Sequence, residues 1–243
     1  MASKKEEWVM PYDRLVAQLK NDIGVELEPV ALRRVQNPPP RVQSLIEELP
    51  SACSFWRKAE QELFYVGAWG HMGCPIGAMV MGFELPKEKE IELLELVGGM
   101  CEIAYLKEEE VKNIPKFESG HSGILYGPLK EFPMEPELVL LWVTPTQAMV
   151  LQEATGETAW TLGPQAGVFG RPACAALPVS LERKRPTLSL GCMGMRTFTE
   201  IAEDRMLLSI PGGILSELEE KIANTISANQ KMKERYLQKK NLL

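Results

Sequence analysis

The same order of segments occurs twice in this sequence, and this recurrence limits the folds that the chain can adopt. Each occurrence has a segment typical of a strand, a proline break, a helical segment, Ala-Cys, a second strand, Gly-Cys and a long helix. The corresponding cysteines are Cys53 and Cys174, which follow alanines, and Cys74 and Cys192, which follow glycines. Alternating strands and helices are typical of α/β proteins, and self-similarity indicates an internal repeat. We therefore predict an α/β fold of two pseudo-symmetric halves, packed into one globular unit.

The hydrophobic pattern divides the chain into three parts. Residues 1–27 contain an N-terminal helix, residues 28–130 form the first half, and residues 131–243 form the second half with a long C-terminal helix. Runs of strand formers predict strands over residues 28–35, 62–66, 137–143, 187–190 and 205–210. Helical periodicity and capping residues predict helices over residues 12–22, 42–49, 51–59, 86–106, 146–154 and 213–237, and a short helix that carries Cys174. Pro75 suits the first position of a further helix, so we expect Cys74 at its N-cap.

Composition and charge exclude several classes of protein. A chain of 243 residues with 45% hydrophobic content can bury a full core. Its net charge of -6 argues against a nucleic-acid partner, because binding along phosphates needs clustered cations, and we interpret the basic residues within 231–240 as a solvated helix face. No apolar run is long enough to span a membrane, and residues 4–7 are charged where a secretory signal would be apolar. We therefore expect a cytoplasmic protein with no membrane partner.

Cysteine chemistry is the strongest indication of function. The cytosol keeps thiols reduced, so we expect the five cysteines to serve packing, metal binding or redox chemistry. If the pseudo-symmetry brings the four paired cysteines together, their thiolates could hold an iron-sulfur cluster or a tetrahedral zinc ion. The intervals of 21 and 18 residues within the two pairs are longer than those of common metal motifs, and buried cysteines often pack as small hydrophobic residues. Cys101 has no counterpart and is interpreted as a core residue.

Parts of the sequence resemble a known family. The stretch from Ala52 to Ala59, with Phe64, Tyr65, His71 and Cys74 to Ala78 after it, is similar to the N-terminal signature of a family catalogued only as domain of unknown function 169. The stretches Cys174 to Pro178, Ser189 to Arg196 and Ile210 to Pro211 resemble its C-terminal half. The resemblance covers most of the chain and implies no established activity. It does imply a prokaryotic and anaerobic setting, because members occur in archaea and anaerobic bacteria.

Two residues outside the cysteines are candidates for cofactor binding. His71 lies three residues before Cys74 and within the family motif, so we favour it over His121 as a metal ligand, an acid-base group or a turn residue. Arg196 could bind an anion at a glycine-rich turn, as could Arg57 or Arg171, although arginines are more often structural. Aromatic residues near the first cysteine pair could wall a planar ligand, but a hydrophobic core is the preferred interpretation; these are Phe55, Trp56, Phe64, Tyr65 and Trp69.

The sequence leaves the question of enzymatic activity open. It has no dinucleotide-binding glycine motif and no phosphate-binding loop, and the segment from Gly120 to Ile124 lacks the second glycine of a nucleophile elbow. No catalytic residue can therefore be assigned.

The leading hypothesis is a cysteine-ligated iron-sulfur or other metal-binding protein, with a redox or accessory role in anaerobic cofactor metabolism. The first alternative is a metal-free module that binds a small anionic or planar ligand such as a tetrapyrrole, and the second is a thiol-disulfide redox protein. The expected partner is a small molecule or a redox protein, and the oligomeric state is left open.

Overall fold

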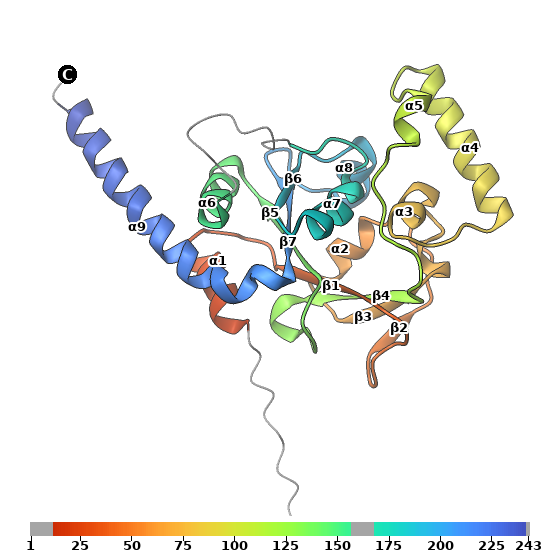
Figure 1. The fold of residues 1–243 in the computed structure, drawn as a ribbon, viewed down its shortest axis with the longest axis horizontal. Coiled ribbons are helices and arrows are strands. Elements are labelled where there is room, and N and C mark those ends of the chain that lie inside the picture. The colour runs from red at the N-terminus through yellow and green to blue at the C-terminus, as the bar shows by residue number, and fades with distance from the viewer. Residues whose placement is uncertain (1–11, 157–167, 242–243) are drawn as a thin grey trace, which may run out of the picture.

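A single seven-stranded mixed sheet forms the centre of the computed structural model, which describes residues 12–156 and 168–241 (Figure 1). The strands are β1 (Val30–Val35), β2 (Gln43–Leu45), β3 (Phe64–Gly67), β4 (Gly123–Pro128), β5 (Leu138–Val143), β6 (Thr187–Ser189) and β7 (Met206–Pro211). Their spatial order is β2-β3-β4-β1-β5-β7-β6. β2 runs parallel to β3, and the other neighbouring strands are antiparallel. The predicted α/β class is confirmed.

The described helices cover both faces of this sheet. They are α1 (Asp13–Asn21), α2 (Ser54–Lys58), α3 (Pro75–Val80), α4 (Lys87–Glu102), α5 (Glu108–Val111), α6 (Pro145–Thr155), α7 (Ala176–Arg183), α8 (Met193–Thr199) and α9 (Leu215–Lys240). Short 3-10 helices occupy Trp69–His71, Leu129–Glu131, Ala173–Ala175 and Gly212–Ile214. Among the residues described, no helix combines the length and the apolar character needed to cross a membrane.

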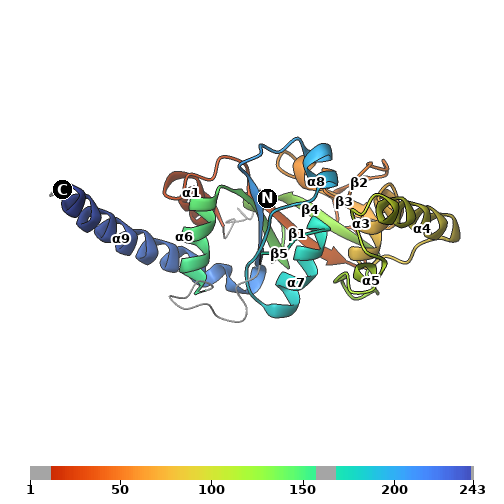
Figure 2. The ribbon, with the colours of Figure 1, turned by 90° about the horizontal axis from the view of Figure 1, so that it is seen from above.

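Two hydrophobic cores lie on opposite faces of the sheet. Side chains alternate along a strand, so Val30 and Leu32 of β1 contact one core while Ala31 contacts the other. Helices α2, α3, α7 and α8 contribute to the first core, and α1, α6 and α9 contribute to the second (Figures 1 and 2). All six residues of β5 are buried, which explains the continuous apolar run that predicted this strand.

The sheet continues across the boundary predicted at residue 130. That position lies in the 3-10 helix Leu129–Glu131, and β1 pairs with β5 beyond it. Strands from both parts of the chain therefore share one sheet.

The predicted helix over residues 42–49 is wrong. Residues Gln43–Leu45 form the edge strand β2, and irregular chain follows as far as Pro50. Ile46 is 87% exposed, so a helix here would have few apolar contacts, and a helix this short is marginal without them. Pairing with β3 instead satisfies backbone groups of the segment.

Strand β4 was not predicted, although it lies between β3 and β1. Its glycines hide the strand pattern, because glycine is uncommon in strand interiors. A Cβ atom at Gly123 would lie 2.4 Å from the ring of Tyr65 and from the carbonyl oxygen of Val66, so only glycine fits. The segment compared with a nucleophile elbow therefore leads into a buried strand.

Candidate functional site

The four paired cysteines line one pocket of about 300 Å³. Cys53, Cys74, Cys174 and Cys192 all contribute to its wall, together with residues of α4. We call this site the cysteine pocket. The prediction placed these cysteines in two corresponding pairs, and the fold brings both pairs to the same place.

Each cysteine reaches the pocket from the start of a helix. Cys53 is the N-cap residue of α2, and Cys174 lies in the 3-10 helix that precedes α7. Cys74 is the N-cap residue of α3, as predicted, and its Sγ accepts a hydrogen bond from the backbone N–H of Gly77 at 3.3 Å. Cys192 caps α8 in the same way, and its Sγ accepts from the N–H of Met195 at 3.4 Å.

Burial keeps most of these thiols protonated. It raises the pKa of Cys53 and of Cys174 well above the usual value, and it also raises the pKa of Cys74. A negative charge on Cys192 would raise the pKa of Cys53 further, and a charge on Cys53 would do the same to Cys174. These mutual effects arise because the sulfur atoms are near one another. At neutral pH, Cys53, Cys74 and Cys174 are therefore neutral thiols.

The rest of the pocket wall is largely apolar, and Arg171 and Glu92 are the charged residues among its described lining. Leu96 and Met100 of α4 line it on one side. The guanidinium of Arg171 lies 4.2 Å from the centre of the Tyr105 ring, and the Tyr105 hydroxyl accepts a hydrogen bond from the N–H of Met193 at 3.4 Å. Arg171 is exposed and forms no ion pair with any residue of the described chain. Its charge is available to a ligand.

Within the described residues, His71 is not part of the wall of the cysteine pocket. Its side chain is 1% exposed, and its ring packs against Phe55 and Phe83 with centroids 4.9 and 4.6 Å away. Nδ1 lies 3.0 Å from the carbonyl oxygen of Gly67 and must donate to it, so Nε2 accepts from the Tyr126 hydroxyl at 3.1 Å. Burial lowers the pKa of His71 to about 4. The structure therefore gives this histidine the contacts of a neutral core residue.

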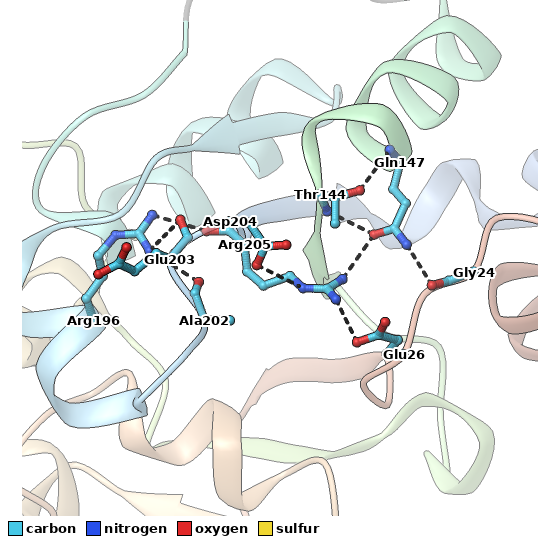
Figure 3. A network of polar contacts seen from close by, with 9 residues as sticks. All are labelled: Gly24, Glu26, Thr144, Gln147, Arg196, Ala202, Glu203, Asp204 and Arg205. Carbon is cyan, nitrogen blue, oxygen red and sulfur yellow. Dashed lines mark hydrogen bonds and ion pairs between the residues drawn. The ribbon is translucent and has the colours of Figure 1, made fainter.

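Arg196 also lies away from the pocket wall within the described residues. Its guanidinium donates to the carbonyl oxygen of Leu190 at 2.7 Å. It also donates to the carbonyl oxygen of Arg205 at 3.1 Å, with longer contacts to Ala202 and Glu203 (Figure 3). These bonds connect the segment before α8 with the segment between α8 and β7. Four backbone carbonyl oxygens therefore contact this guanidinium.

A second polar network beside Arg196 was not predicted. The buried side chain of Arg205 donates to Glu26 at 2.6 Å and to Gln147 at 3.4 Å (Figure 3). Gln147 closes a capping box with Thr144 at the start of α6 and donates to the carbonyl oxygen of Gly24. The network connects α6, the residue before β7 and the segment before β1, so its role is structural.

The other predicted candidates divide between core and surface. Phe55, Trp56 and Phe64 are buried in the first core, which confirms the preferred interpretation for them, and Trp69 is 63% exposed. Arg57 pairs with Glu60, whose carboxylate also accepts from the indole N–H of Trp142.

Sequence reasoning missed the contribution of α4 to the pocket. The four-residue spacing of Leu96 and Met100 put both on one helix face, but nothing in the pattern says what that face covers.

The described residues were compared for side chains that could bind a metal ion. All five cysteines are free thiols. No group of three or more His, Cys, Asp or Glu side chains in the described ranges is arranged to hold a metal ion.

Comparisons with known proteins give a family but no activity. The model of a family described as uncharacterised ArCR, DUF169, matches residues 18–221. No curated protein matches the chain. No solved structure matches it either.

Proposed function

The chain belongs to the DUF169 family, which brings no assigned activity, and we propose that it holds an iron-sulfur cluster in the cysteine pocket. The ligands would be Cys53, Cys74, Cys174 and Cys192, and the role would be redox or accessory work in anaerobic cofactor metabolism. One observation supports this above all: four thiols from distant parts of the chain line the same pocket. Four cysteine thiolates are the usual ligand set of such clusters.

A cluster suits this pocket better than a single zinc ion does. The volume of about 300 Å³ exceeds what one ion needs.

The surroundings of the sulfur atoms support the same proposal. Hydrogen bonds from backbone N–H groups stabilise the negative sulfur of a bound cluster, and both Cys74 and Cys192 already accept such a bond. Apolar side chains such as Leu96 and Met100 would limit the access of water to it. Loading would displace protons from the buried thiols.

Thiol-disulfide chemistry has less support. The attacking species in disulfide exchange is the thiolate, and burial favours the neutral thiol at Cys53, Cys74 and Cys174.

An organic ligand is the second candidate, and Arg171 favours it. A cation without an ion-pair partner in the described chain stands at the edge of an apolar pocket, as a carboxylate-bearing ligand would require. The volume lies at the lower end of ligand pockets, so a small acid fits better than a tetrapyrrole. Native mass spectrometry should then find a retained organic molecule that chelators do not remove and that Arg171→Met protein loses.

The cluster is tested by anaerobic purification and reconstitution. We expect bound iron and sulfide in stoichiometric amounts and a visible absorption band. Serine at position 53, 74, 174 or 192 should remove most of this band, whereas Cys101→Ser, outside the pocket wall, should keep it. Circular dichroism establishes that each variant is folded. Folded wild-type protein that remains colourless and free of iron after reconstitution would contradict the proposal.

We also propose that the two halves arose by internal duplication. In the central pair of strands, Ala31 is opposite Val139, and a two-fold axis there would exchange β1 with β5, β4 with β7 and β3 with β6. Two details support this axis. Val30 pairs with Pro128 and Leu138 pairs with Pro211, and each proline precedes a 3-10 helix.

The outer edges of the sheet support the duplication as well. β2 runs parallel to β3, and Phe169 forms a parallel bridge with Ser189 of β6. Superposing residues 28–130 on residues 131–243 in an experimental structure tests the proposal. Strands β1, β3 and β4 should then overlay β5, β6 and β7, and a poor overlay would contradict a duplication.

A further inference from the structure

Helix α4 presents an unpartnered face to solvent. None of its residues is fully buried, and Ile91 and Leu94 are 50% and 71% exposed. Glu88, Glu95 and Glu102 lie on the same side, because helical residues separated by three, four or seven positions share a face. We call these five residues the α4 outer face. Its three carboxylates form no ion pair within the described residues.

The packing of the described chain does not explain why two residues of α4 are glycines. A Cβ atom at Gly98 or Gly99 would meet nothing within 4 Å. Glycine within a helix costs about 1 kcal/mol relative to alanine, so the pair weakens the helix without any gain in intrachain packing. Small residues do allow the backbone of another helix to approach closely.

Helix α9 ends in a segment that leaves the body of the protein. Its last buried residue is Ile222, and its last contact with α6 through a hydrogen bond is from Asn229 to Glu153 at 2.7 Å. Every residue from Gln230 to Lys240 is exposed, and this stretch projects away from the sheet in both views (Figures 1 and 2). We call residues 230–240 the α9 projection. A helix end without tertiary packing has little to stabilise it, so a surface that packs against it would be favourable.

The α9 projection matches the α4 outer face in charge and in apolar character. The projection has one acidic residue, Glu234, and five basic residues, which are Lys231, Lys233, Arg235, Lys239 and Lys240. None of these cations is ion-paired within the described chain. Among them, Tyr236 and Leu237 are 63% and 48% exposed. The opposite charges favour association of these surfaces over contact between two copies of either one.

The two surfaces lie at opposite ends of the molecule. Figures 1 and 2 place the end of α9 at one extreme of the long axis and α4 at the other. They cannot meet within one chain. We propose that the α9 projection binds the α4 outer face of a second copy, with Tyr236 and Leu237 packing against Ile91 and Leu94 inside a ring of ion pairs. The proposal does not depend on what the cysteine pocket holds.

Charge reversal with rescue tests this contact. Sedimentation velocity of the full chain should show self-association that grows with concentration and weakens with salt. One variant combines Lys233→Glu, Arg235→Glu and Lys239→Glu, and the other combines Glu88→Lys, Glu95→Lys and Glu102→Lys. Each alone should weaken association roughly tenfold or more, since it replaces several attractive pairs with repulsive ones. An equimolar mixture of the two should associate again, because each reversed surface then meets its complement.

A control variant reverses two charges elsewhere. Arg14→Glu with Lys116→Glu changes two exposed cations outside both surfaces and should leave association unchanged. Wild-type protein that stays monomeric at all concentrations would overturn the proposal, as would association that neither triple variant weakens. A monomer whose α9 projection instead binds vesicles of phosphatidylcholine and phosphatidylglycerol would also overturn it and assign the basic helix to an anionic membrane surface.

Discussion

Acidification should destabilise this protein through His71. The ring is 1% exposed, and burial lowers its pKa to about 4 in the folded state. In the unfolded chain the same ring has its ordinary pKa of about 6.5. Above about pH 6.5 the ring is neutral in both the folded and the unfolded state, so His71 has no effect on the pH dependence of stability. Between pH 6.5 and about 4 the unfolded state binds a proton that the folded state does not bind, so the free energy of unfolding falls as the pH falls.

The size of this loss follows from the two pKa values. One pKa unit corresponds to about 1.4 kcal/mol, so a change from 6.5 to about 4 amounts to about 3 kcal/mol once both states are protonated. Carboxylates also titrate in this range, which makes the difference between wild-type protein and a His71→Gln variant the quantity of interest. Glutamine does not titrate, and the variant should lack this part of the pH dependence whatever its stability at neutral pH.

Urea unfolding between pH 7.5 and 4 measures the effect. His121→Gln is the matched control, since the chain has only two histidines and His121 is less buried. We expect the control to keep most of the loss seen in wild-type protein and His71→Gln to lose it. An NMR titration of wild-type protein provides a second measurement, with one histidine titrating near pH 4. Equal acid destabilisation of wild-type protein and His71→Gln, or an ordinary pKa for both histidines, would refute the reasoning.

Other substitutions test the packing and the polar network. Gly123→Ala places a Cβ atom 2.4 Å from the ring of Tyr65 and should lower the free energy of unfolding by about 1–3 kcal/mol. Gly99→Ala has open space and should raise it by roughly 1 kcal/mol, so thermal melts that move in the same direction for both would contradict this account. Arg205→Met removes charged hydrogen bonds from a buried site and should cost roughly 2 kcal/mol in urea unfolding. Glu26→Gln alters a carboxylate that is 72% exposed and should cost less than about 1 kcal/mol; the reverse order would be inconsistent with the network.

The elements that could be predicted were those whose own side chains decide their structure. The apolar run of β5 and the helical pattern of α9 need no knowledge of their neighbours. β4 and β2 depend on neighbours instead. Gly123 is required by the approach of Tyr65, and Gln43–Leu45 becomes a strand because the edge of β3 is free to pair with it. Contacts of that kind are not encoded in local periodicity.

The candidate site also contains residues that the sequence identifies and residues that only the tertiary structure reveals. The sequence surroundings singled out Cys53, Cys74, Cys174 and Cys192, and all four line one pocket. His71 lies three residues from Cys74 in the sequence, and its ring contacts the Tyr126 hydroxyl in the core. The apolar wall from α4 and the cation of Arg171 come from segments that only the tertiary structure brings together.

The central claim is that the cysteine pocket holds iron. A crystal structure of the anaerobically reconstituted protein, with anomalous diffraction recorded on both sides of the iron absorption edge, tests it most directly. The account predicts an iron signal inside the pocket, with Cys53, Cys74, Cys174 and Cys192 around it. A pocket without iron in well-diffracting crystals of reconstituted protein, or iron bound only at another place on the chain, would contradict it.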